Sequence, residues 1–189
     1  MKRIIVGITG ASGTLMAEAL LTELKGIDGV ETHLIISDAA KQSFMDENHR
    51  DASDLEKLAD VIYDNRNIGA AVASGSFETE GMIVIPCSMK SLSGIANGYS
   101  DSLLLRAADV CIKEGRKTVL VPREMPLSKI HLRNLSYAAD AGCIIIPPML
   151  SFYENRATLS EQIDAVIGKV LSQFGFTSSN ALHWTGNNK

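Results

Sequence analysis

Residues 2–14 read Lys-Arg-Ile-Ile-Val-Gly-Ile-Thr-Gly-Ala-Ser-Gly-Thr, and this stretch decides the fold. Residues 2–8 form an apolar run of strand length, and residues 9–14 form a turn of small residues that leads into an amphipathic helical pattern. Gly and Ser let backbone N–H groups approach an anion, and the following helix points its positive dipole end there. We therefore predict a phosphate-binding βα unit, with a phosphorylated group on Gly10 to Gly13. The dinucleotide motif G-x-G-x-x-G is absent, and similar turns also occur where nothing binds.

Length and charge limit the possible classes of protein. The chain has 189 residues, which suggests a single domain over 1–189, and a polar tail at about 178–189 is predicted to be an arm or interface segment. Lys and Arg total 18 against 22 acidic residues, so no overall field attracts nucleic acid or an acidic membrane. The apolar runs are shorter than the roughly 20 residues of a membrane span, and no signal peptide is evident, so we expect a cytoplasmic protein. The three cysteines are widely spaced and suggest neither a disulfide framework nor a metal site.

The hydrophobic pattern along the chain predicts a parallel α/β fold. Six strands alternating with helices indicate a Rossmann-like three-layer sandwich with a doubly wound parallel sheet of flavoprotein type. Right-handed crossovers place the strand-to-helix loops on one edge of that sheet. Strands are assigned to 2–8, 30–36, 81–86, 117–121 and 143–146, and helices to 15–25, 38–48, 53–61, 100–114, 127–141 and 159–174, with a further helix after Ser88.

The second predicted strand argues against a nicotinamide cofactor. Such units usually present an acidic residue about 20 residues after the glycines, whereas this strand closes on Ser37, and Asp38 is more simply a first-turn helix charge. Within the strand, His33 is expected to face solvent. Ser53 and Glu56 are predicted to form a capping box, and residues 46–51, apart from Glu47, to be a solvated turn.

Two later loops carry polar residues where strands end. Ser88 is predicted to cap a helix while its own N–H and that of Ser91 face a ligand. Arg123 and Glu124 lie between two prolines at the rim where doubly wound sheets bind ligands, although a surface ion pair would also account for them. Two turn-to-helix junctions in one sheet suggest that one ligand bridges both.

Several blocks, in order along nearly the whole chain, resemble the UbiX/Pad-type flavin prenyltransferases. The blocks are Thr9-Gly10-Ala11-Ser12-Gly13, Ala73-Ser74-Gly75-Ser76-Phe77, Pro86-Cys87-Ser88-Met89-Lys90, Arg106-Ala107-Ala108-Asp109-Val110, Val121-Pro122-Arg123-Glu124-Met125-Pro126, Ile130-His131-Leu132 and Pro147-Pro148-Met149 with Phe152-Tyr153. The resemblance implies a metal-independent transferase that joins the dimethylallyl group of dimethylallyl phosphate to N5 and C6 of reduced FMN. The product, prenylated FMN, would serve a UbiD-type aromatic or phenolic acid decarboxylase, and the family tends to form dodecamers.

The resemblance also implies roles for individual residues. FMN would be held by Gly10, Ala11, Ser12, Ser37, Ser88, Met89, Lys90, Ser91 and Arg123. The allylic phosphate would be surrounded by Lys113, Arg123, Tyr153, Lys169 and Arg106, the last from the same or a neighbouring subunit. Ser12, Glu47 and Glu124 match positions that move the N5 proton and place phosphate, and a carboxylate can do so if burial raises its pKa. Lys113 and Tyr153 complete the implied catalytic set.

Four departures from the family pattern and three rival functions remain. Ala17 stands where members often have Gly, Arg133 follows Ile130-His131-Leu132 where members usually have Glu, Lys169 stands where some members have Arg, and a Trp found in some members near Gly69 is missing. One rival is an FMN-dependent cysteinyl decarboxylase, for which His49 is the candidate catalytic histidine. The second is a non-catalytic flavin-binding subunit of a decarboxylase, and the third and weakest is a direct decarboxylase of hydroxybenzoates. The sequence does not say whether the prenyl donor is a mono- or a diphosphate, or which aromatic acid the partner decarboxylates.

Overall fold

The structure is a computed structural model that describes residues 1–152 and 157–178. Helices and strands alternate along most of the chain, as the hydrophobic pattern predicted. The elements are β1 Lys2–Ile8, α1 Leu15–Lys25, β2 Val30–Ile36, α2 Asp38–Asn48, α3 Ser53–Glu56, β3 Val61–Asp64, η1 Ala71–Ala73, β4 Gly81–Cys87, α4 Met89–Ala96, α5 Leu103–Lys113, β5 Lys117–Pro122, α6 Lys129–Asp140, β6 Ile144–Ile145 and α7 Leu159–Ser172.

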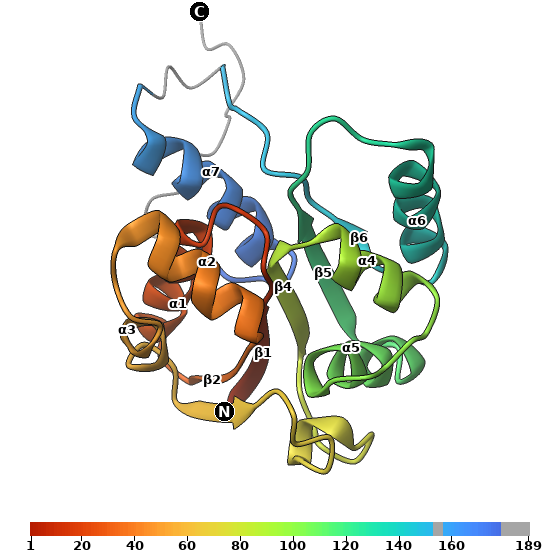
Figure 1. The fold of residues 1–189 in the computed structure, drawn as a ribbon. Coiled ribbons are helices and arrows are strands. Elements are labelled where there is room, and N and C mark those ends of the chain that lie inside the picture. Colours follow the sequence, from red (N-terminus) through yellow and green to blue (C-terminus); the bar gives the residue numbers. More distant parts are fainter. Residues whose placement is uncertain (153–156, 179–189) are drawn as a thin grey trace, which may run out of the picture.

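The sheet is doubly wound, which confirms the predicted fold class. Its six strands lie in the order β3-β2-β1-β4-β5-β6, and every pair is parallel. The chain moves outward from β1 to β3 and then returns to β4 on the other side of β1, so the strand order reverses between β1 and β4. A crevice at the carboxyl ends of the strands is the usual ligand site at such a point. In Figure 1 this edge is the upper one, and the N terminus lies at the lower edge.

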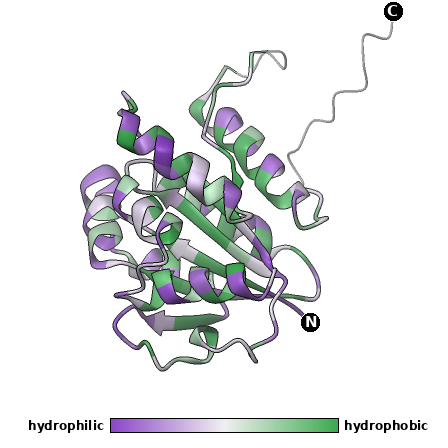
Figure 2. Ribbon diagram, turned by 90° about the vertical axis from the view of Figure 1, so that its right-hand side faces the viewer, coloured by the Kyte–Doolittle hydropathy of each residue, from purple (hydrophilic) through white to green (hydrophobic). Residues whose placement is uncertain are grey.

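Helices cover both faces of the sheet. One core packs side chains of α1, α2 and α7 against β1 and β2, and the other packs α4 and α5 against β4. Figure 1 shows these two layers on either side of the strands, and the strands are mostly green in the hydropathy view of Figure 2. All seven residues of β4 are buried, as expected for a central parallel strand covered on both faces.

Only five of the six strands correspond to ranges that the hydrophobic pattern indicated. The sixth, β3, falls at the end of the predicted helix 53–61, and that helix is in fact the four residues of α3. The predicted capping box is also wrong, because Ala52, and not Ser53, occupies the N-cap position of α3 and makes no side-chain cap, and the Ser53 N–H donates to Asp51 Oδ1 at 2.8 Å. In the part of the chain that the structure describes, no helix is long and apolar enough to cross a membrane.

Candidate functional site

Three strand-to-helix junctions meet at the upper edge of the sheet. They follow β1, β2 and β4, and the first two are in close contact at Gly10. A Cβ added to Gly10 would lie 2.5 Å from Ala39 Cβ and 3.1 Å from the Ala39 carbonyl carbon. Real Cβ atoms do not approach so closely, so glycine is required where the first turn touches the start of α2. Ser37 caps that helix by accepting a hydrogen bond from Ala40 N–H at 3.1 Å.

Glu47 binds the N-terminus of α1 with its carboxylate. It accepts hydrogen bonds from Gly13 N–H at 3.0 Å, from Thr14 N–H at 3.0 Å and from the Thr14 hydroxyl at 2.7 Å. Thr14 makes no side-chain cap of its own helix, so Glu47 of α2 supplies the acceptor that α1 needs. Because Ala11 N–H also donates to Thr9 O, part of the predicted anion-binding turn uses its donors within the chain.

These hydrogen bonds decide the ionisation of Glu47. Partial burial raises the pKa of the carboxyl, but hydrogen bonds from Thr14, Ser12 and Gly13 outweigh it and hold the pKa below its ordinary value. The condition attached to this residue in the sequence analysis, a pKa raised by burial, is therefore not met. Glu47 is an anion and a hydrogen-bond acceptor at neutral pH.

The β4–α4 junction differs from its prediction. Ser88 does cap α4, since its Oγ accepts from Ser91 N–H at 3.3 Å. The Ser88 N–H does not face a ligand, however, because it donates to the Thr9 hydroxyl at 2.7 Å. The Ser91 N–H is taken by the cap. Helix geometry leaves the first-turn amides without intrahelical partners, so those of Met89 and Lys90 are the ones directed at the edge.

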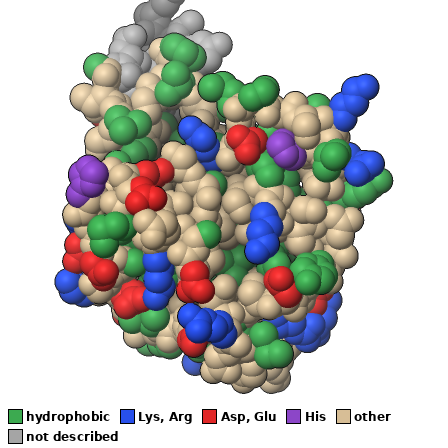
Figure 3. Space-filling view, viewed as in Figure 1, with side chains coloured by type: hydrophobic (Ala, Val, Ile, Leu, Met, Phe, Trp, Pro, Cys, Tyr) green, Lys and Arg blue, Asp and Glu red, His purple; other side chains and the backbone are tan. Residues whose placement is uncertain are grey.

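A cleft of about 410 Å³ opens beside the first junction. Ser12, Glu47, Asn48, Arg123 and Gln162 are the polar side chains that line it, and the remaining walls are mostly apolar side chains of α1, α7 and residues 148–150. Among the described residues that line it, Arg123 is the one cation. Several apolar side chains near this rim are exposed, including Met149 at 73% and Leu150 at 62%. Figure 3 shows hydrophobic side chains gathered along the upper rim.

The other predicted cations do not line this cleft. Arg106 forms an ion pair with Asp109 at 2.7 Å on α5, and Lys113 pairs with Glu114 at the end of that helix. Lys169 is exposed in the last turn of α7. Glu124 is exposed and accepts a hydrogen bond from Met125 N–H at 3.0 Å. Tyr153 and residues 179–189 lie outside the described residues, so the predicted role of Tyr153 and most of the predicted tail have no structural counterpart here.

Sequence reasoning missed Asn48 and Gln162. Asn48 donates to the Thr14 hydroxyl at 2.9 Å, and that hydroxyl in turn donates to Glu47. Gln162 accepts from Ser151 N–H at 2.7 Å and donates to Ser151 O at 3.1 Å, which ties the segment before α7 to that helix. An amide next to a predicted catalytic carboxylate was a usable signal for Asn48. No local pattern pointed to Gln162.

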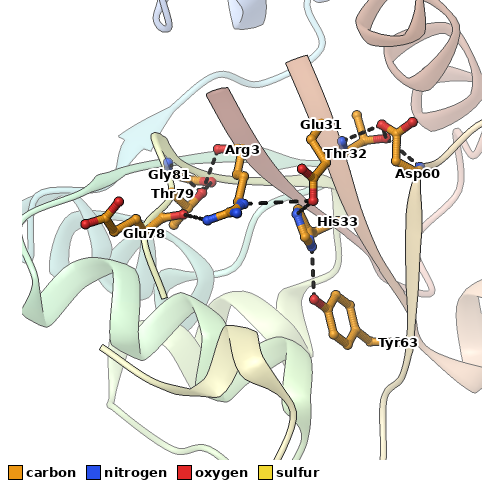
Figure 4. A network of polar contacts seen from close by, with 9 residues as sticks. All are labelled: Arg3, Glu31, Thr32, His33, Asp60, Tyr63, Glu78, Thr79 and Gly81. Carbon is orange, nitrogen blue, oxygen red and sulfur yellow. Dashed lines mark hydrogen bonds and ion pairs between the residues drawn. The ribbon is translucent and has the colours of Figure 1, made fainter. Parts of the chain in front are cut away.

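His33 is buried, contrary to the predicted solvent-facing position. Its Nδ1 lies 2.9 Å from the Tyr63 hydroxyl and its Nε2 lies 2.9 Å from Glu31 Oε1 (Figure 4). Burial lowers the pKa of His33 against the opposing effect of Glu31. The ring stacks on Tyr63 and meets the edge of Phe77. His33 therefore packs with Tyr63 and Phe77, which adjoin the core under α4 and α5, and it does not line the cleft.

These features define a doubly wound α/β protein with a nucleotide-type ligand site at its switch point. A family model described as Flavoprotein matches residues 1–175. A probable UbiX-like flavin prenyltransferase from Sedimentibacter hydroxybenzoicus is 54% identical over 184 residues, which are 97% of each chain.

Two solved structures agree closely with the fold. The dodecameric FMN-dependent Ubix-like decarboxylase from Escherichia coli O157:H7 is 48% identical, with a TM-score of 0.95 over 97% of this chain and 100% of that one. AnUbiX (PadA1), solved with FMN and dimethylallyl pyrophosphate, is 40% identical, with a TM-score of 0.95 over 98% of each chain. The chain belongs to the flavoprotein family and, within it, to the UbiX-like flavin prenyltransferases.

Proposed function

We propose that this protein transfers the dimethylallyl group of dimethylallyl phosphate to reduced FMN and so makes prenylated FMN. The observation that carries the proposal is full-length similarity, at 54% identity, to a protein named as a flavin prenyltransferase. A relative that shares 40% of its residues binds FMN and dimethylallyl pyrophosphate in its solved structure. The product would be released to a UbiD-type decarboxylase, which uses it as cofactor.

The residues at the junctions fit FMN. Gly10 leaves the first turn free of a side chain where it meets α2, and the starts of α2 and α4 bring helix dipoles to the same edge. We assign flavin binding to the turn at 10–12, to Ser37, to the first turn of α4 and to Arg123. The reduced flavin supplies the nucleophilic N5 and C6 atoms. The chain's part is to hold them against the prenyl group and to keep water away.

The cleft fits the prenyl donor. Its apolar walls suit a dimethylallyl group, and Arg123 in its lining can stabilise the negative charge of the leaving phosphate as the C–O bond breaks. Glu47 cannot be a proton donor at neutral pH, because its hydrogen bonds keep it ionised. We assign it the role of a hydrogen-bond acceptor that orients Ser12.

The one cation among the described cleft residues, Arg123, is too few for a departing phosphate dianion without a metal. Arg106 and Lys113 are partly exposed on α5, away from the residues that line the cleft, and we propose that a neighbouring subunit brings them to it. The dodecameric state of the Escherichia coli relative supports such an assembly. Lys169 would act in the same composite site as a point charge.

The rival functions lack comparable support. His49, the candidate histidine of a cysteinyl decarboxylase, ends α2 in a left-handed conformation and is exposed, and it is not among the residues that line the cleft. A non-catalytic flavin-binding subunit would need no apolar cleft beside the flavin site.

The test is a mass spectrum of the flavin after reaction. The full-length protein is incubated with FMN, dithionite and either dimethylallyl monophosphate or the diphosphate. A flavin heavier by one prenyl group is the expected result, and the arm with the faster rate identifies the donor. Parallel incubations with a cysteinyl acid and with 4-hydroxybenzoate measure CO₂ release. An unmodified flavin, with CO₂ release or with only co-purification of a decarboxylase, refutes prenyl transfer.

Two variants show whether the cleft is the site of the reaction. Arg123→Met should lower prenylation strongly, since it removes the one cation among the described residues that line the cleft. Arg133→Met is the matched control, because Arg133 is exposed on α6 and is not among the cleft residues. Equal activity of the two variants would remove Arg123 from the proposed site.

A further inference from the structure

Thr9 links two junctions of the flavin site through its side chain. Its hydroxyl donates to Pro86 O at 2.7 Å and accepts from Ser88 N–H at 2.7 Å. The Thr9 N–H adds a third hydrogen bond to Pro86 O at 3.3 Å. Thr9 is only 1% exposed, so solvent cannot take the place of either partner. One buried hydroxyl therefore binds both a carbonyl and an N–H group of the backbone at the end of β4, as donor to the first and acceptor from the second.

These bonds lie where the sheet no longer holds the two segments together. The register of β1 with β4 runs from Ile4 opposite Gly81 to Gly7 opposite Val84. Beyond Ile8, every hydrogen bond between residues 9–14 and residues 86–91 of the described chain involves Thr9. The separation between the first turn and the start of α4 is therefore set by this side chain.

We propose that Thr9 is a positioning residue for the flavin. Its hydroxyl fixes the first turn and the start of α4 at the separation at which their amides contact one FMN molecule together. It also binds the Ser88 N–H, so the ligand meets the amides of Met89 and Lys90 instead. This inference rests on the proposed function in that FMN is the ligand. It goes beyond that function by giving a role in FMN binding to Thr9, whose side chain does not itself contact FMN.

Thr9→Val tests the inference with a side chain of the same shape. The valine methyl cannot accept from Ser88 N–H, and a buried donor left without a partner favours a shifted junction. The FMN dissociation constant should rise at least about tenfold, which corresponds to about 1.4 kcal/mol. Thr9→Ser keeps the hydroxyl and should bind FMN nearly as the wild type does. The KM for dimethylallyl monophosphate at saturating FMN should stay unchanged in both variants.

Thr32→Val is a matched control for general loss of stability. Thr32 is also 1% exposed, and its hydroxyl donates to Asp60 Oδ2 at 2.9 Å and accepts from Asp60 N–H at 3.0 Å. It pairs with Ile4, near the opposite edge of the sheet. The control should lower the melting temperature and leave FMN binding unchanged. FMN binding is followed by quenching of flavin fluorescence on the full-length protein.

The outcomes separate the two proposals. A wild-type protein that does not bind FMN overturns both. If the wild type binds and prenylates FMN while Thr9→Val binds it equally well, only the role of Thr9 is overturned. Should Thr9→Val not fold, Thr9→Ser and Thr9→Ala give the same comparison, since both lack the methyl group. Hydrogen exchange on the wild type is independent of any variant, and rapid exchange of the Ser88 amide would also refute the inference.

Discussion

Gly10→Ala tests the packing of the first turn against α2. No left-handed strain complicates the substitution, because Gly10 is not among the positive-φ glycines. Its whole effect comes from the new methyl group, 2.5 Å from Ala39 Cβ and 3.3 Å from Ala39 O. Carbon atoms in contact prefer about 3.5–4.0 Å, so the turn and the start of α2 must separate by about 1 Å. Backbone atoms on both sides prevent relief by a change of rotamer.

The expected cost follows from two opposing terms. Overpacking at a tight contact costs about 1–3 kcal/mol. Replacing Gly by Ala at a permitted φ regains about 0.4–1 kcal/mol by restricting the unfolded chain. The net loss is therefore about 1 kcal/mol, or about 2–4 °C in melting temperature for a chain of this length. The same displacement moves the amides of the turn, so FMN affinity should fall by more than the stability does.

Thermal unfolding and an FMN titration measure the two effects separately. Gly26→Ala is the control, because its added Cβ would lie 3.4 Å from Glu23 O and its φ is −82°. It should keep or slightly raise the melting temperature and leave FMN binding intact. If Gly10→Ala melts and binds FMN as the wild type does, the first turn and α2 can accept the methyl group, contrary to this prediction. An equal loss of affinity in Gly26→Ala would show that the effect is not specific to the contact at Gly10.

Three further predictions concern charge, assembly and the thiols. Glu47→Gln should lower the melting temperature at neutral pH. Because the pKa of Glu47 is lower in the folded protein, its contribution to stability is complete above the unfolded pKa of about 4.3 and disappears as pH falls through the folded value. A difference in melting temperature between the variant and the wild type that is equal at all pH values would contradict this. Co-assembled Arg106→Ala and Glu47→Gln subunits should regain part of the prenylation that each variant loses alone, and no recovery would place Arg106 outside a shared site. Burial raises the pKa of Cys87 to about 12, so maleimide should not label it in the native protein; mass spectrometry that finds labelling would contradict this.

The fold could be predicted because its central strands are continuous apolar runs bounded by turns. β3 was not placed, since it is a four-residue edge strand with alternating half-buried and exposed residues. Its pairing with β2, from His33 opposite Val61 to Ile36 opposite Asp64, is what makes it a strand. That pairing is a tertiary contact with no local signal. Because β3 begins at Val61, the chain must leave the helix before that residue, and α3 is a single turn, Ser53–Glu56.

The burial of His33, in the middle of β2, could not be predicted from the local sequence either. His33 follows Glu31 and Thr32, a polar sequence that is typical of an exposed strand end. Tyr63 and Phe77, from distant parts of the chain, cover its ring. Composition around a residue does not show which aromatic side chains will fold over it. The same limit applies to Gln162, whose partner Ser151 lies on a segment without periodic pattern.

A sequence motif predicts which backbone N–H groups lie at the site better than it predicts whether each one meets a ligand or an acceptor of the protein. The first turn and the Ser88 junction do offer amides to an anion, as their residue types require. Four of the amides at these junctions nevertheless donate to side chains of the same protein. Those of Gly13 and Thr14 donate to Glu47, that of Ser88 donates to Thr9, and that of Ser91 donates to Ser88. A ligand receives the amides that no internal acceptor reaches, and only the folded arrangement determines which these are. Cations are distributed in a similar way: among the described residues that line the cleft, Arg123 is the one cation, and Arg106 and Lys113 are instead paired with carboxylates on or next to α5.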